Sequence, residues 1–184
     1  MGTPYRPVVL DAYTDEVKDI YSLGEREAHR LGHPRIDSDH LVMGIIAQRH
    51  NLAADYLTKH GLTYARLPEL SEQVAGNVAH RVCFDGHDID DTRPSLEVLN
   101  ILQLGRLLIV RENRAAADRR FATPLHLLQA ILLRTTQNPQ MQQLLYSPGK
   151  GGHQVRPGVK LLLANGVDID ELTSQIAAEP RSWF

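Results

Sequence analysis

The stretch DHLVMGII, residues 39–46, has a near copy further along the chain in LHLLQAIL, residues 125–132. In both, a histidine precedes a run that would be apolar on almost every face of a helix, which predicts a buried helix. Each stretch follows a long amphipathic segment and precedes a short helical segment, a glycine-centred turn and a final helical segment. The sequence therefore predicts a duplicated four-helix unit.

Helical spacing of apolar residues extends outward from the two stretches, and no segment reads convincingly as part of a sheet. Thr14 is placed to cap the first helix, which Gly32 and Pro34 end. Half of such a chain has a thin core, so the repeats should pack against each other. We predict an all-α fold in a single domain, 1–184, of two pseudo-symmetric four-helix repeats. The expected parts are repeat one over about 10–80, a linker over 81–91 and repeat two over about 92–178, with helices over 38–49, 52–59, 68–79, 98–109, 124–134, 159–164 and 169–178.

Composition excludes several classes of protein. Lys and Arg total 20 against 22 Asp and Glu, for a formal charge of −2, which argues against a nucleic-acid partner. The single cysteine, Cys83, excludes an internal disulfide and a four-cysteine metal site. The N-terminus lacks a signal peptide, and no apolar run approaches the roughly 18 residues of a membrane helix. We expect a cytoplasmic protein with no membrane partner.

The repeat resembles the double N-terminal domain of the Clp family of ATP-driven unfoldases, which includes ClpA, ClpB and ClpC. Tyr13-Thr14, Glu27-Ala28 and Leu31-Gly32-His33 follow the family's first-helix motifs in register, and the run 36–41 follows its His motif. In the second copy, residues 121–127 are similar to the Pro-Leu-His-Leu of the ClpB type. The resemblance covers about residues 10–178 and implies the same all-α architecture.

The family's ATPase modules have no counterpart in this sequence. A Walker A loop needs GxxxxGK[ST] between a strand and a helix. Gly149-Lys150 is the only Gly-Lys pair, and it lacks both the Ser or Thr and the strand. The ending EPRSWF and the divergence from unfoldase sequences favour a stand-alone relative over an excised domain.

What the resemblance implies is a non-enzymatic module that binds proteins or peptides: Clp substrates, adaptors or a ClpC-type unfoldase. ClpC-type members also bind phosphorylated arginine, and the matching positions here are Thr14 and Asp39. A carboxylate can pair with the guanidinium while a helix N-terminus supplies donors to the phosphate. In the second repeat Thr92 is present but Leu125 replaces the acid. The alternative is that Thr14 only caps a helix and Asp39 only complements its dipole.

Other functions are left open beside this one. The ClpC domain is the target of cyclic peptide antibiotics of the cyclomarin type, and a motor-free copy could act as a decoy by mass action. Asp91 and Leu10 stand where that pocket has phenylalanines. A small helical hydrolase would need a nucleophile and base that the sequence does not display. A helical nucleic-acid binder is disfavoured by the charge.

The histidines are predicted to be structural. His40 and His126 recur at matching points, which favours an imidazole that bonds a nearby backbone group. His29 and His33 are four residues apart, but the helix that they would need as metal ligands is broken at Gly32 and Pro34. His80, Cys83, His87 and Asp88 match no trusted metal spacing. We therefore expect no catalytic residue, no metal and no cofactor.

Overall fold

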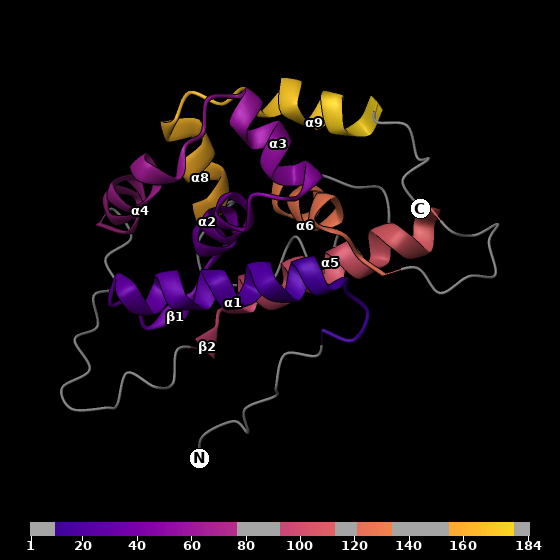
Figure 1. Cartoon of the computed structure of the whole chain (residues 1–184), viewed down its shortest axis with the longest axis horizontal. Coiled ribbons are helices and arrows are strands. Elements are labelled where there is room, and N and C mark those ends of the chain that lie inside the picture. Colours follow the sequence, from indigo (N-terminus) through magenta and orange to yellow (C-terminus); the bar gives the residue numbers. More distant parts are fainter. Residues whose placement is uncertain (1–9, 77–92, 113–120, 134–154, 179–184) are drawn as a thin grey trace, which may run out of the picture.

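The computed structural model describes residues 10–76, 93–112, 121–133 and 155–178, and the structural statements below concern these residues (Figure 1). They fold into four helices from each half of the chain, with a short 3-10 turn, η1 (Tyr64–Arg66), before the fourth. The first half holds α1 (Asp15–Arg30), α2 (Ser38–Gln48), α3 (Leu52–Lys59) and α4 (Leu67–Gly76). The second half holds α5 (Leu96–Glu112), α6 (Pro124–Leu132), α8 (Pro157–Ala164) and α9 (Ile169–Ala178). The all-α prediction is confirmed.

Helices α3 and α9 have the predicted bounds. Asn51 caps α3 by accepting a 2.8 Å hydrogen bond from the amide of Ala54, and the chain leaves the helix through Gly61 at φ 82°. Gly166 at φ 77° has the same role after α8. A positive φ is unstrained only for glycine, so the two glycine-centred turns of the sequence mark equivalent points of the repeats.

Helix α5 begins earlier than the sequence indicated. It starts at Leu96, and the hydroxyl of Ser95 accepts a 3.3 Å hydrogen bond from the amide of Val98. Ser95 is therefore the capping residue of this helix. Thr92, which the sequence analysis matched to Thr14, and the expected linker over 81–91 lie outside the described residues.

Two short parallel pairings, which the sequence did not predict, tie the repeats together. Strand β1 (Arg35–Ile36) pairs with strand β2 (Arg93–Pro94), and an isolated bridge joins Tyr13 to Ala122. At the first pairing the amide of Ser95 donates to the carbonyl of Ile36 at 2.9 Å. At the second, the amide of Thr14 donates to the carbonyl of Ala122 at 3.0 Å.

These hydrogen bonds show that the two repeats exchange contacts at the starts of their helices. The first helix of each repeat begins against the segment that leads into the second helix of the other repeat. We call the contact of Ile36 and Ser38 with Ser95 and Glu97 the first junction. The contact of Tyr13 and Thr14 with Ala122 is the second junction. Ser95 is thus the structural counterpart of Thr14.

The two halves share one core. Helix α8 of the second repeat packs on α2 and α4 of the first, and α3 of the first repeat packs on α6 of the second. Figure 1 shows α8 beside α2, with α1 and α5 running along the opposite side of the molecule. The buried apolar residues of both halves form one cluster. Packing between the repeats supplies the burial that one half alone lacks, as predicted.

Candidate functional site

The two repeated histidines stabilise the starts of two helices. The backbone amide of Asp37 donates to Nδ1 of His40 at 2.9 Å, and the amide of Thr123 donates to Nδ1 of His126 at 3.2 Å. In each case the histidine is the third residue of its helix and completes a reciprocal capping arrangement with the residue before the helix. Both side chains are buried. The prediction that these imidazoles bond a nearby backbone group is confirmed.

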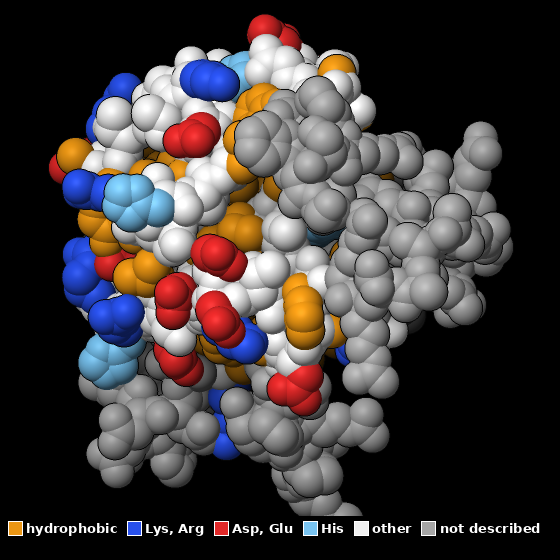
Figure 2. Space-filling view, turned by 45° about the vertical axis from the view of Figure 1, so that its right-hand side comes forward, with side chains coloured by type: hydrophobic (Ala, Val, Ile, Leu, Met, Phe, Trp, Pro, Cys, Tyr) orange, Lys and Arg blue, Asp and Glu red, His pale blue; other side chains and the backbone are white. Residues whose placement is uncertain are grey.

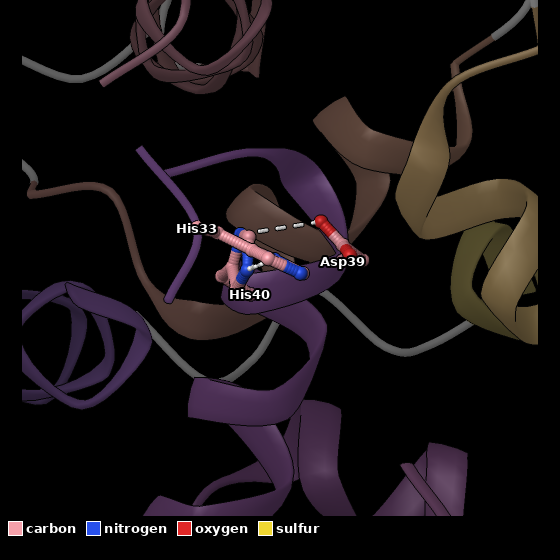
Figure 3. Close-up of side chains that lie close together, drawn as sticks. All are labelled: His33, Asp39 and His40. Atoms are coloured by element: carbon pink, nitrogen blue, oxygen red, sulfur yellow. Dashed lines mark hydrogen bonds and ion pairs between the residues drawn. The ribbon is translucent and has the colours of Figure 1, made fainter. Parts of the chain in front are cut away.

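His40 also belongs to a cluster with His33 and Asp39 that the sequence analysis missed (Figure 3). Nδ1 of His33 lies 2.7 Å from Nε2 of His40, and Oδ1 of Asp39 lies 3.3 Å from Nδ1 of His40. The three possible ligand atoms lie within 4.8 Å of one another, a spacing that could suit a metal ion. The only sequence signal was the family motif Leu31-Gly32-His33, which precedes the His motif.

The hydrogen bonds favour a network over a metal site. Because Nδ1 of His40 accepts the Asp37 amide, Nε2 carries the proton of the neutral ring and donates to Nδ1 of His33. Neither nitrogen of His40 then has a free lone pair, and a metal ligand needs one. The cluster is better suited to fixing the loop between α1 and α2.

Asp39 is nearly inaccessible, with 3% of its surface exposed. Its Oδ2 accepts a 2.5 Å hydrogen bond from the hydroxyl of Ser71 in α4. Its Oδ1 has no hydrogen-bond partner among the described residues. The order Ser71–Asp39–His40 places the carboxylate between the hydroxyl and the imidazole. A serine nucleophile needs the imidazole next to its hydroxyl, so this chain of contacts is not a hydrolytic triad.

Thr14 is the N-cap of α1 by its backbone, since its carbonyl accepts from the amides of Val17 and Lys18. Its side chain makes no capping hydrogen bond, and Oγ1 is buried without a partner in the described part of the chain. Asp15 and Glu16 follow in the first turn, both exposed. These carboxylates complement the helix dipole and would repel a phosphate at this end of α1.

Thr14 and Asp39 lie at different junctions. Asp39 is next to His40, whose carbonyl faces Gly24 of α1, and Thr14 lies about 15 Å from Gly24 at 1.5 Å per residue. The helix-capping residue at the junction of Asp39 is Ser95. Of the buried side-chain oxygens and nitrogens that are described, Thr14 Oγ1 and Asp39 Oδ1 are the two without a partner. The two predicted ligand-binding residues therefore lie at separate places in the fold.

The first junction is fixed by Ser38, the first residue of α2. The hydroxyl of Ser38 donates to Glu97 of α5 at 2.7 Å and accepts from the amide of Gly158 of α8 at 2.8 Å. Arg156 approaches the same carboxylate, with its Nε 3.9 Å from Oε1 of Glu97. A fully buried hydroxyl of the first repeat thus connects two helices of the second.

Burial perturbs the acids of this junction. Loss of water raises the pKa of Glu97 to about 7, although the Ser38 hydroxyl and Arg156 oppose the shift. Burial also raises the pKa of Asp37, with a further contribution from the charge of Asp39. Near neutral pH the junction therefore carries less negative charge than its three acids suggest.

Arg156 has a structural counterpart in the other repeat. It donates to the carbonyls of Ala130 and Ile131 near the end of α6, at 3.2 Å for Ile131. Asn51 donates in the same way to the carbonyl of Ile45 near the end of α2, at 3.0 Å. Both residues come directly before the third helix of their repeat and satisfy carbonyls that the second helix leaves open. Arg156 is therefore a connecting residue of the fold.

Apolar side chains are exposed around both junctions. Leu96 and Leu99 of α5 are 63% and 38% exposed, and Val155 is exposed directly before Arg156. Phe121, next to Ala122 of the second junction, is 50% exposed. Figure 2 shows one face of the molecule, where apolar side chains lie among acidic ones and basic side chains gather at one edge. Contiguous exposed apolar surface is typical of interaction sites.

The sequence profile of the Clp repeat N-terminal domain matches residues 12–136, which is more than half of the chain, and the protein belongs to this family. It is 25% identical over 162 residues to the chaperone protein ClpB of Oceanobacillus iheyensis, and 25% identical over 166 residues to the chloroplastic chaperone protein ClpC of Pisum sativum. The alignments cover 86% of this chain, but only 19% and 17% of those relatives.

Solved structures give the same fold. The N-terminal domain of ClpD from Arabidopsis thaliana superimposes with a TM-score of 0.57 at 14% identity, covering 92% of this chain and 97% of that one. The Hsp104 N-terminal domain from Candida albicans gives a TM-score of 0.55 at 12% identity, covering 91% of each chain. In the part of the chain that is described, no helix has the length and apolar character needed to span a bilayer.

Proposed function

We propose that the protein is a non-enzymatic, polypeptide-binding module of the Clp system that acts in the cytoplasm. It would hold Clp substrates or adaptors, and so deliver them to a ClpC-type unfoldase or withhold them from it. Family membership supports the class of function. The identity of the binding residues and of the partners is what we propose.

One observation carries it. Exposed apolar side chains accompany the junctions between the repeats, where Leu96, Leu99 and Phe121 adjoin backbone pairings. A junction built from both repeats is rigid, because it is fixed by hydrogen bonds such as the partly buried one from Ser38 to Glu97. Apolar side chains held open on a rigid frame can bind unfolded segments with little loss of entropy in the protein.

The test uses an unfolded probe. Reduced and carboxymethylated α-lactalbumin, labelled with fluorescein, should bind the full chain in a fluorescence anisotropy titration. The native, calcium-loaded form of the same protein is the matched control and should not bind. Affinity capture from the native lysate should in addition enrich a Clp ATPase, an adaptor or a client. Absence of binding to the unfolded probe, together with absence of all three from the capture, would contradict the proposal.

Phosphoarginine is a second candidate ligand, because the two residues that the resemblance implied carry the two unpartnered buried oxygens. If Thr14 and Asp39 bind it, free phosphoarginine should shift the amide resonances of both residues in an NMR titration. The acids that follow Thr14 oppose the phosphate, so we expect the larger shift at Asp39. Unchanged spectra at millimolar ligand would leave both residues with structural roles.

The decoy alternative is tested separately, by the melting temperature of the chain. A cyclic peptide of the cyclomarin type would bind the chain and raise its melting temperature with ligand concentration. Leu10, where the family pocket has a phenylalanine, packs against the core, and Asp91 lies outside the described residues. An unshifted melting temperature would remove the decoy role and leave polypeptide binding untouched.

A further inference from the structure

The two histidine caps differ in one neighbouring residue. In both repeats, Nδ1 of the histidine accepts the backbone amide of the residue before the helix. Asp39 precedes His40 in the first repeat, and Leu125 precedes His126 in the second. Oδ1 of Asp39 lies 3.3 Å from Nδ1 of His40. The first cap therefore has a carboxylate beside the capping nitrogen, and a leucine in the second cap offers no such group.

Nδ1 of His40 has two neighbours that compete for it. The amide of Asp37 donates to it at 2.9 Å, which requires that the nitrogen carry no proton. The carboxylate oxygen Oδ1 of Asp39 is buried, has no hydrogen-bond partner among the described residues, and can bond this nitrogen only if the nitrogen is protonated. The two hydrogen bonds therefore exclude each other, and the proton on Nδ1 decides between them.

His33 determines where an added proton goes. Its Nδ1 lies 2.7 Å from Nε2 of His40, and Figure 3 shows the pair beside Asp39. Two imidazoles in this contact have three places for ring protons: Nε2 of His33, the shared place between the rings, and Nδ1 of His40. The neutral pair holds two protons and leaves Nδ1 of His40 bare. A third proton therefore lies on Nδ1 of His40, whichever ring carries the charge.

The surroundings supply a counter-charge for this proton, without which a buried cation would be costly. The charged and titratable groups around the pair are Glu27 with Arg30 and Tyr64 from α1 and η1, Asp37 near Arg35 from the loop, and Glu97 with Arg156 from α5 and the start of α8. Helix α4 contributes the hydroxyl of Ser71 to Oδ2 of Asp39. Oδ1 of Asp39 is thus the acceptor that a protonated Nδ1 meets.

We propose that the His33–His40 pair is a proton switch, in which a proton added to Nδ1 of His40 moves its hydrogen bond from the amide of Asp37 to the carboxylate of Asp39. The proton comes from solvent, and no covalent step is involved. The amide of Asp37 then loses its acceptor. Asp37 directly follows Ile36, whose carbonyl accepts the amide of Ser95 at 2.9 Å, so the first junction loosens in acid. The proposal does not depend on polypeptide binding.

The acids of the first junction respond to pH in the opposite sense. Burial raises the pKa of Glu97 to about 7 and also raises the pKa of Asp37, so folding favours the protonated form of both. As the pH falls through about 7, their protonation stabilises the folded protein. Loosening of the first junction over the same range would therefore come from the histidines and not from these acids.

The test follows the full chain by NMR from about pH 8 to about pH 5.5, a range in which histidine commonly takes up a proton. Long-range correlations in the imidazole ring show which nitrogens of His40 carry protons. Hydrogen exchange, corrected for the intrinsic effect of pH, gives the protection of single amides. We expect Nδ1 of His40 to gain a proton while the protection of the Asp37 amide falls at least about tenfold. The amide of Thr123, in the cap without an acid, is the internal control and should change less than about twofold.

Two variants separate the switch from general loosening in acid. His40→Gln keeps an acceptor for the amide of Asp37 and cannot be protonated, so this amide should stay protected over the whole range. Asp39→Asn keeps an acceptor for Ser71 but has no charge to pair with the imidazolium, so Asp37 should stay protected to lower pH than in wild type. Asp19→Asn, at an exposed acid of α1, is the matched control and should follow wild type.

Several outcomes would overturn the proposal. The switch is refuted if Nδ1 of His40 takes up no proton by about pH 5.5, or if Asp37 keeps its protection after Nδ1 is protonated. Equal loss of protection at Asp37 and Thr123 would show general loosening, as would an undiminished loss at Asp37 in His40→Gln. All these measurements concern the protein alone, so failure to bind unfolded α-lactalbumin would refute the proposed function and leave the switch untouched.

Discussion

A Cβ atom built on Gly24 would lie 2.9 Å from the carbonyl oxygen of His40. A Cβ on Gly44 would lie 2.3 Å from the carbonyl of Ile20. Helices α1 and α2 therefore cross backbone against backbone, with a glycine from each helix at the crossing. This close approach brings the carboxyl half of α1 against the His motif and thereby places His40 and Asp39.

We expect Gly24→Ala to destabilise the protein, because the backbone of α2 cannot yield as a side chain could. Overpacking of this kind costs about 1–3 kcal/mol, against which the better helix propensity of alanine returns about 1 kcal/mol. The counterpart, Gly105→Ala, should be tolerated better, since its Cβ would lie 3.2 Å from the Tyr13 hydroxyl and 3.8 Å from the His126 carbonyl, and no backbone atom would be closer. Urea unfolding of both variants checks the difference. Equal destabilisation would mean that the crossing is not the constraint.

His40→Ala should lower the free energy of unfolding by about 1–3 kcal/mol, because the partly buried amide of Asp37 loses its acceptor and His33 loses its donor. His126→Ala should cost less, since its bond to the Thr123 amide is longer. Glutamine at the third helical position also accepts from the capping residue. His40→Gln should therefore recover much of the loss in thermal melts, and a variant as unstable as His40→Ala would argue against the capping role.

Glu97 gives a pH dependence with a defined sign. Its pKa is raised from 4.5 to about 7 in the folded protein, so folding favours the protonated form. The stability from this group is complete below about pH 4.5 and is lost as the pH rises through about 7, a change on the order of 3 kcal/mol. Glu97→Gln keeps an acceptor for the Ser38 hydroxyl and cannot ionise. Its stability should fall less than that of wild type between about pH 5 and about pH 8.

The control for this experiment is Glu16→Gln, which removes an exposed acid of α1. Denaturant unfolding at the two pH values should give the control the same slope with pH as wild type. A Glu97→Gln protein whose stability follows the wild-type slope would show that Glu97 ionises in the folded protein as it does in the unfolded chain.

Thr14→Val tests the unpartnered hydroxyl at the second junction. Valine keeps the shape of threonine and removes a buried oxygen that has no described hydrogen-bond partner. Such a change should leave the free energy of unfolding within about 0.5 kcal/mol of wild type, or raise it. A clear loss in urea unfolding would mean that the hydroxyl is paired in the folded protein. Loss of phosphoarginine shifts at unchanged stability would instead assign the hydroxyl to a ligand.

Much of the fold could be predicted because local signals agreed with it. The helix over 52–59 and the glycine-centred turn after it were predicted as the structure has them, with Gly61 at the turn, and the recurring histidines indicated their structural role. The predicted start of α5 was wrong because the apolar periodicity begins at Val98, the first buried apolar residue of the helix, whereas the helix begins at the exposed Leu96. The periodicity of apolar residues indicates which face of a helix is buried, but it does not indicate which repeat covers that face. The exchange at the junctions was therefore beyond the sequence.

The candidate site was harder to predict for the same reason. Thr14 and Asp39 were paired because they belong to one repeat, whereas the structure puts Ser95 at the junction of Asp39. That they bind a ligand stays a prediction. Leu96 and Leu99 looked like ordinary members of an apolar helix, since only packing separates an exposed leucine from a buried one. Glu97 gave no signal, because its pKa depends on burial by distant segments.

The exchange at the junctions also bears on how such a chain could arise. Two identical copies of one half could satisfy each other's helix starts in the same reciprocal way, as the subunits of an isologous pair do. The protein is equivalent to a fused homodimer. After fusion the two copies no longer need to be identical, so one copy could acquire exposed leucines where the other kept an ion pair.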